Sequence, residues 1–174
     1  MGHYQIANEE IYIAVVLTVV LSEIFGIALH ELSHLIVLIA FKGNLTGLNF
    51  GVVSSVEGYV PYKAVPYIAM APFVIPTILF LTCLTFKSIR KHFYASLVVV
   101  VLSGATVRTT LMNLIALCIN PVNAQTRATW DLILAIDSSI SHWYVFVIVS
   151  ILCVIASSYV FYRHTRVMLA ILED

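Results

Sequence analysis

Four long apolar segments dominate this 174-residue sequence and limit what it can fold into. A helix needs about 20 mostly apolar residues to cross the hydrocarbon core of a bilayer. The four segments run over 11–41, 64–86, 94–119 and 143–162. Hydrophobic residues make up 61% of the chain and charged residues only 10%, whereas about a quarter of the residues of a soluble domain are charged. The sequence therefore predicts a single integral membrane domain over 1–174, an all-α bundle of about four transmembrane helices.

Two connecting segments are long enough to have structure of their own. The segment 42–63 is rich in Gly, Val, Ser and Tyr and partly alternates, which predicts a short β-hairpin or paired extended segments at the membrane surface after the first span. The second connection contains the Asn-Pro pair at 120–121 and then the apolar run WDLILAI. That run predicts a short helix over about 128–137 that dips into the bilayer.

The distribution of charge indicates orientation and excludes one class of partner. The formal net charge is zero, so the chain lacks the basic excess typical of a nucleic-acid-binding protein. Five basic residues fall on the side of the N-terminus, and three on the other: Lys87, Arg90, Lys91, Arg163 and Arg166, against Lys42, Lys63 and Arg127. The positive-inside rule then predicts that both termini are cytoplasmic. Four histidines at chain ends or in loops are expected at the interface: His3, His92, His142 and His164.

The first span contains the motif His30-Glu31-Leu32-Ser33-His34. Residues four apart on a helix share a face, with Cβ atoms about 6 Å apart, so both histidines can reach one Zn²⁺. The glutamate of an H-E-x-x-H motif acts as general base on water at the metal. Ionisable residues at the centre of a span each cost about 3 kcal/mol, which favours a function for them. The alternative interpretation is a polar patch that packs against other helices or lines an ion path.

A catalytic zinc ion usually has three protein ligands and water, so the two histidines need a further partner. Asp131 is the strongest candidate, because it begins the apolar helical run after a polar loop. Asp137 lies six residues further on, on a different face of such a helix. Glu23 lies on the same stripe as His30 but about 10 Å away along the helix axis. We predict that Asp131 completes the site, with Asp137 and Glu23 as alternatives.

Three further polar residues fall within the predicted spans. Glu23 suits either a hydrated access path with contacts to the metal ligands or a position at the membrane interface. Arg108 suits either a structural ion pair with Glu23 or Asp131, or stabilisation of an oxyanion during catalysis. Asn113 could form a hydrogen bond in the same cavity or across a helix–helix contact.

This combination of residues resembles a known family. HELSH in the first apolar segment, a later aspartate after a polar stretch and few spans are similar to the zincin peptidase family of small bacterial membrane proteins. That family is related to the site-2-protease-like intramembrane zinc metallopeptidases. The stretch FGVVSSVEGYVPYKAVPYIAMAPFVIP is similar to the family's extended segment and proline-containing span. The resemblance covers most of the chain from Ile24 to Ala135, and HExxH is its specific part.

The resemblance implies roles for four residues: zinc ligands at His30, His34 and Asp131, and a general base at Glu31. It also implies that a strand of an unwound substrate pairs with the extended segment after the first span, by edge-strand addition. The sequence departs from the site-2-protease pattern in two places. Leu132 follows the aspartate where those enzymes have glycine, and the Asn-Pro pair lies ten residues ahead of it.

Motif, context and resemblance together predict a zinc-dependent membrane metallopeptidase that hydrolyses a peptide bond within or next to the bilayer. Its expected partners are Zn²⁺, the lipid bilayer and a membrane-embedded or membrane-proximal peptide or protein substrate. The resemblance implies a bacterial cytoplasmic membrane. Two alternatives stay open: a non-enzymatic protein that handles metal or other ions, such as a transporter or accessory factor, and an inactive peptidase-like scaffold.

Overall fold

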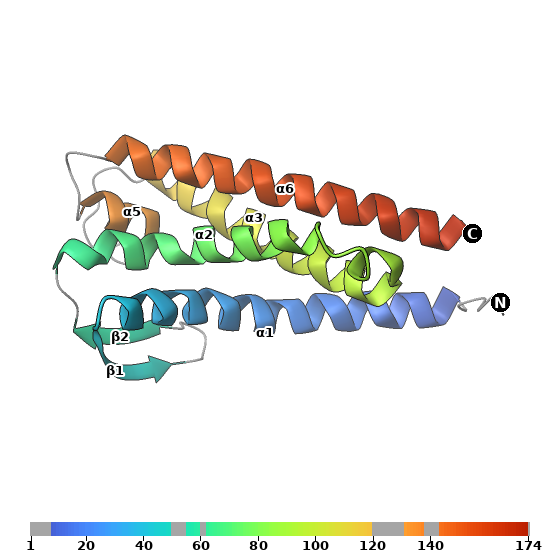
Figure 1. Ribbon diagram of the computed structural model, residues 1–174, viewed down its shortest axis with the longest axis horizontal. Coiled ribbons are helices and arrows are strands. Elements are labelled where there is room, and N and C mark those ends of the chain that lie inside the picture. The colour runs from blue at the N-terminus through green and yellow to red at the C-terminus, as the bar shows by residue number, and fades with distance from the viewer. Residues whose placement is uncertain (1–7, 50–54, 60–61, 120–130, 138–142, 174) are drawn as a thin grey trace.

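Four long helices form most of the structure, a computed structural model that describes residues 8–49, 55–59, 62–119, 131–137 and 143–173 (Figure 1). The helices are α1 (Asn8–Ala40), α2 (Val65–Cys83), α3 (Phe93–Ile119) and α6 (Trp143–Glu173). Each contains a stretch long and apolar enough to cross a membrane. Successive long helices run in opposite directions, so α1 begins and α6 ends at the same end of the bundle (Figure 1). The predicted four-span helical membrane bundle is confirmed.

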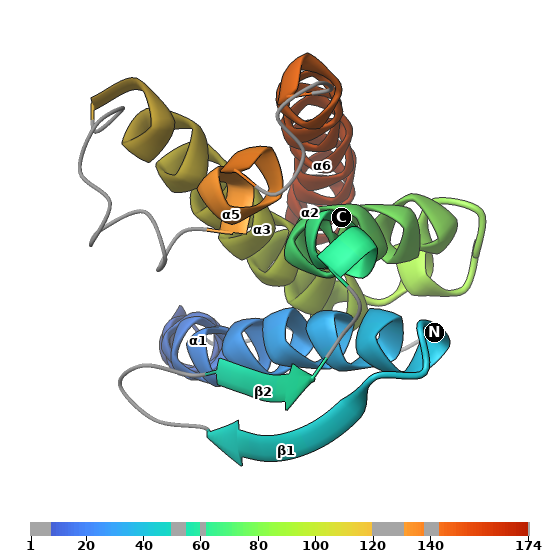
Figure 2. The same ribbon diagram turned by 90° about the vertical axis from the view of Figure 1, so that its left-hand side faces the viewer.

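The hairpin predicted after the first span is present. Its strands, β1 (Asn44–Asn49) and β2 (Ser55–Tyr59), pair antiparallel, with Asn44 opposite Tyr59. The register shifts between Leu45 and Gly47. The hairpin lies on the side of α1 that faces away from the other long helices (Figure 2).

A Schellman motif ends α1 and turns the chain toward the hairpin. The Gly43 N–H donates to the Leu38 carbonyl, and the Lys42 N–H donates to the Ile39 carbonyl, both at 2.9 Å. This motif needs a left-handed residue directly after the helix, which is usually glycine. Here Lys42 takes that conformation, with φ 57°.

The predicted short helix is present as α5 (Asp131–Asp137), while 128–130 and the Asn-Pro pair lie outside the described residues. Its apolar side chains pack against α2 and α6. The buried cluster that holds it there consists of Ala69, Met70, Phe73, Leu132, Ala135 and Cys153. The start of α5 is thereby held against the first half of α2, toward the end of the bundle where α2 begins (Figure 1).

The helix of the fourth span continues beyond the predicted end of that span near Tyr162, since α6 runs to Glu173. The charged residues Arg163 and Arg166 end the apolar stretch but are good helix formers, so they do not end the helix. The extension also contains His164, which we expected at the interface. Its side chain is fully buried, with Nδ1 3.3 Å from Oγ of Ser96 on α3.

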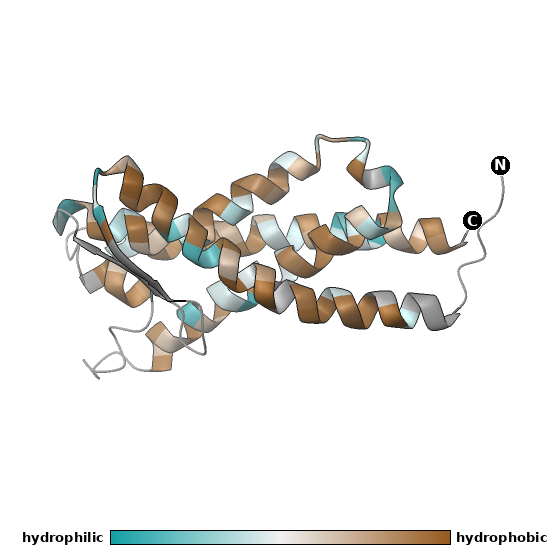
Figure 3. Ribbon diagram, turned by 90° about the horizontal axis from the view of Figure 1, so that it is seen from below, coloured by the Kyte–Doolittle hydropathy of each residue, from teal (hydrophilic) through white to brown (hydrophobic). Residues whose placement is uncertain are grey.

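The apolar faces of the long helices point outward. On α1, large side chains such as Val20, Ile24 and Ile39 are each at least half exposed. In water such a surface would be unfavourable, but in a bilayer it contacts acyl chains, which are equally apolar. Apolar residues dominate the long helices, and hydrophilic residues gather at the turn between α2 and α3 (Figure 3). The exposed surface therefore fits a multi-pass membrane protein.

Buried polar residues recur at seven-residue spacing on α3 and on α6, two helices that pack against each other, and these two rows are called the seam. The fully buried set comprises Ser96, Ser103 and Thr110 on α3, and Ser150, Ser157 and His164 on α6. Small side chains let membrane helices approach closely, and their hydroxyl groups can bond backbone carbonyls within the helix. The Ser103 hydroxyl donates to the Val100 carbonyl at 3.1 Å in this way. The Thr110 hydroxyl donates to the Thr106 carbonyl in the same way, whereas Oγ of Ser150 has no hydrogen-bond partner among the described residues.

We expect Ser103→Leu to lower the free energy of unfolding by about 1–3 kcal/mol, because the larger side chain overpacks the seam between α3 and α6. Met112→Leu is the matched control, since Met112 lies on the same helix and is exposed. The measurement is reversible unfolding in mixed detergent micelles. Equal stability of the two variants would contradict the packing described for the seam.

Candidate metal centre

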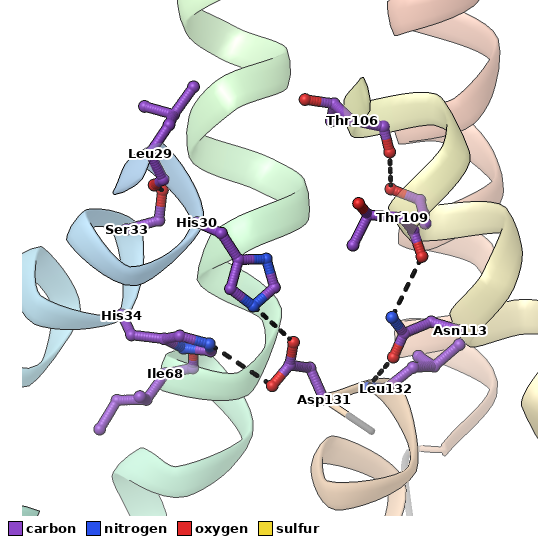
Figure 4. A network of polar contacts seen from close by, with 11 residues as sticks. Leu29, His30, Ser33, His34, Ile68, Thr106, Thr109, Asn113, Asp131 and Leu132 are labelled. Atoms are coloured by element: carbon purple, nitrogen blue, oxygen red, sulfur yellow. Dashed lines mark hydrogen bonds and ion pairs between the residues drawn. The ribbon is translucent and has the colours of Figure 1, made fainter. Parts of the chain in front are cut away.

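His30 and His34 lie one turn apart on α1, and both rings point toward the start of α5 (Figure 4). The ring centroids are 4.9 Å apart, and the ring planes are nearly perpendicular at 82°. Both side chains are largely buried, with 23% and 12% exposed. The helical spacing thus places two imidazoles around one point, as predicted.

Asp131, the first residue of α5, supplies a carboxylate at that point. Its Oδ2 lies 3.1 Å from Nε2 of His30, and its Oδ1 lies 3.4 Å from Nε2 of His34. One ligand-type atom from each of the three residues lies within 4.8 Å of the other two. The structure therefore brings the Asp131 carboxylate from the short helix α5 to the histidine pair.

These separations suit a tetrahedral metal ion. Zinc lies about 2.1 Å from nitrogen and oxygen ligands, so two ligands at a tetrahedral angle are about 3.4 Å apart. The two nitrogen–oxygen distances, 3.1 Å from His30 to Oδ2 and 3.4 Å from His34 to Oδ1, are close to that value, although they reach different oxygens of the carboxylate. Two imidazoles and one carboxylate are also the ligand types found in zinc sites that keep a fourth position for water. The three residues together could hold Zn²⁺.

The other ring nitrogen of His34 is held by a backbone group of α2. Its Nδ1 lies 2.8 Å from the carbonyl oxygen of Ile68. Because a carbonyl can only accept, Nδ1 carries the proton and donates it. A metal-binding histidine commonly directs its second nitrogen to such an acceptor, which fixes the ring orientation. Nε2 of His34 is thereby directed at Asp131.

The histidines also determine the ionisation of Asp131. Burial raises the pKa of this carboxyl group, but hydrogen bonds and charge interactions with His30 and His34 outweigh burial and lower the pKa to about 2. A carboxylate must be deprotonated to bind a metal ion. Asp131 is therefore ionised at neutral pH.

Asn113 on α3 holds the N-terminus of α5. Its Oδ1 accepts a hydrogen bond from the backbone N–H of Leu132 at 3.2 Å, and its Nδ2 donates to the Thr109 carbonyl at 3.1 Å (Figure 4). The Asn113 side chain is 3% exposed. Of the two interpretations offered by the sequence, the structure shows the helix–helix contact, since this bond joins α3 to α5 next to Asp131. Asn113 is not among the residues that line the cavity shared by Arg108 and His30.

Two other predicted residues lie near the histidines. Glu31, next to His30 in the chain, is 3% exposed. Arg108 lines a cavity of about 210 Å³ together with His30, and Pro72, Pro76 and Thr109 form other parts of its wall. The cavity gives His30 a neighbouring space large enough for several water molecules or one side chain.

The two alternative third ligands belong to described helices. Glu23 belongs to α1 and Asp137 is the last residue of α5, but their side chains lie outside the described part of the structure. Within that part, the one group of three or more metal-ligating side chains is His30, His34 and Asp131.

Comparison of the chain with protein-family models, curated proteins and solved structures found no match. The arrangement of the site residues themselves is therefore what indicates a function.

We expect Asn113→Ala to increase the rate of hydrogen exchange at the Leu132 amide about fivefold, because a net hydrogen bond contributes about 1 kcal/mol. The measurement is amide hydrogen exchange on the detergent-solubilised protein. Met112→Ala, at the exposed neighbouring position, is the control and should leave the Leu132 amide unchanged. Unaltered exchange in Asn113→Ala would show that Asn113 does not hold α5.

Proposed function

We propose that this chain is a zinc-dependent membrane metallopeptidase that hydrolyses a peptide bond within or next to the bilayer. The observation that supports it most is the convergence of His30, His34 and Asp131 on one point in an apolar bundle. A structural zinc site is usually closed by four protein ligands, whereas three ligands are typical of a catalytic site. The resemblance to zincin-type membrane peptidases agrees with this proposal.

Glu31 is the proposed general base. It adjoins His30 on α1 and is buried, so its carboxylate acts in surroundings with little competing water. Bound Zn²⁺ would act as a Lewis acid that activates water at neutral pH. In this role Glu31 would accept a proton from the attacking water and donate it to the amine of the leaving product.

The surroundings of the site support a membrane-embedded or membrane-proximal substrate. His30 and His34 belong to an apolar stretch, Val15–Ala40, that is long enough to cross a membrane. The hairpin of β1 and β2 follows α1 directly, at the same end of the bundle as α5 (Figure 1). A substrate strand could add to an edge of this hairpin, which would hold it extended at the end of the bundle that contains α5.

The orientation in the membrane stays a prediction. Basic residues favour cytoplasmic termini in a bacterial cytoplasmic membrane. The metal ligands lie toward the opposite end of the bundle from Asn8 and Glu173 (Figure 1). Cleavage is therefore proposed in the half of the bilayer that faces away from the cytoplasm.

Metal analysis tests the ligand set first. Purified wild-type protein should contain about one Zn²⁺ per chain, because a catalytic zinc site of this type holds a single ion. His30→Ala should lose that ion while remaining folded, and His92→Ala is the control, since His92 is exposed at the turn before α3. Elemental analysis and circular dichroism provide the two measurements. Wild-type protein that binds no zinc would refute the proposal.

Glu31→Gln separates an enzyme from a metal-handling protein. The variant should keep its zinc but lose hydrolysis by a factor of about 100 or more, because glutamine cannot act as a base. Hydrolysis is measured as new amino termini released from a mixture of transmembrane peptides reconstituted with the protein in liposomes. If wild type and Glu31→Gln both bind zinc and neither releases products, the ion-handling or inactive-scaffold alternative is favoured.

A further inference from the structure

A proline inside α2 changes the hydrogen bonding of the helix next to the histidines. Pro72 is buried within α2. In an α-helix the N–H of residue 72 would donate to the carbonyl of residue 68. Proline has no N–H, so it cannot make this bond. The carbonyl of Ile68 therefore lacks the donor that any other residue at position 72 would supply.

That same carbonyl is the acceptor for His34. The Nδ1 atom of His34 lies 2.8 Å from the oxygen of Ile68, across the contact between α1 and α2 (Figure 4). The bond is largely shielded from water, since the His34 side chain is 12% exposed. The carbonyl oxygen of Ile68 thus receives no hydrogen bond from position 72 of its own helix and accepts one from His34 instead.

We infer that Pro72 is a positioning residue for the metal centre, because it reserves the Ile68 carbonyl for the Nδ1–H of His34. This bond leaves Nε2 as the nitrogen that faces Asp131, at 3.4 Å from Oδ1. It also fixes the rotation of the ring, because the ring is then held at both nitrogens. A histidine held through one nitrogen alone can still rotate. The inference rests on the proposed metal site, but the hydrogen bond itself exists without a metal.

Pro76 provides a matched control, because it makes the same chemical change one turn further along α2. Both prolines are buried within the helix, and both line the cavity beside His30. Pro76 removes the donor for the carbonyl of residue 72, not for that of Ile68. A general effect of proline on the path of α2 or on the cavity would appear in both variants, whereas the proposed effect belongs to Pro72.

The first measurement uses metal-free protein labelled with ¹⁵N in its histidine rings. In the wild type, the Nδ1–H proton of His34 should be protected from exchange with water, and its hydrogen bond should move its chemical shift downfield. In Pro72→Ala the new backbone N–H competes for Ile68, so this signal should lose its protection. Pro76→Ala should retain it, and absence of the signal in His34→Gln assigns it. Alanine is a stronger helix former than proline, so the two variants should fold.

The second measurement is the dissociation constant of Zn²⁺, determined by competition with a chromophoric chelator. Groups that orient a metal-binding histidine typically change metal affinity 10–100-fold. We expect about a tenfold weaker affinity in Pro72→Ala and an unchanged affinity in Pro76→Ala.

Each result has a definite meaning. A protected Nδ1–H in both proline variants, or equal loss of zinc affinity in both, would overturn the role of Pro72. If the wild type shows the Pro72-dependent proton but binds no zinc, the proposed peptidase function fails while the histidine-positioning role stands. If Pro72→Ala alone loses both the protection of the Nδ1–H proton and the affinity for Zn²⁺, the inference is supported.

Discussion

The contact between the α1 histidines and Asp131 is the interaction on which the rest of the arrangement depends. Ionisable groups in an apolar bundle are unfavourable unless they are partnered. His30 and His34 meet this requirement by facing a carboxylate on α5, at 3.1 and 3.4 Å. The contact joins the first helix of the chain to a segment about 100 residues later. It consequently determines how α1 lies against the remaining helices.

α2 connects this contact to the other helices. It accepts the His34 hydrogen bond at Ile68, packs against α5 through the cluster around Phe73, and reaches α6 through the Thr77 and Ser157 hydroxyl groups at 3.0 Å. Prolines are tolerated in membrane helices where neighbouring groups satisfy the released carbonyls. At Ile68 the neighbouring group is a proposed metal ligand. The same proline that weakens the helix locally therefore provides an acceptor where the site needs one.

The sequence predicts the parts of the structure that depend on local spacing. Apolar length predicts the four spans, and the i, i+4 spacing of His30 and His34 places them on one face. Asp131 could be selected because the chain has few other acidic residues away from its termini. The Ile68 contact and the burial of His164 depend on how separate helices align, which no local pattern specifies. The one local indication of the Ile68 contact is Pro72, because a proline in a helix leaves the carbonyl four residues earlier without its usual donor.

Holding Asp131 on a short helix has a physical consequence for the site. Seven residues are too few for a stable isolated helix, so α5 depends on its buried cluster and on Asn113 for its position. Any ion bound by the three residues would stabilise the docked form of α5, because binding favours the state that presents all the ligands. Asn113 from α3 and the Ile68 carbonyl from α2 restrain the two sides of the centre independently. Together they limit the movement of a carboxylate and an imidazole that come from elements distant in the chain.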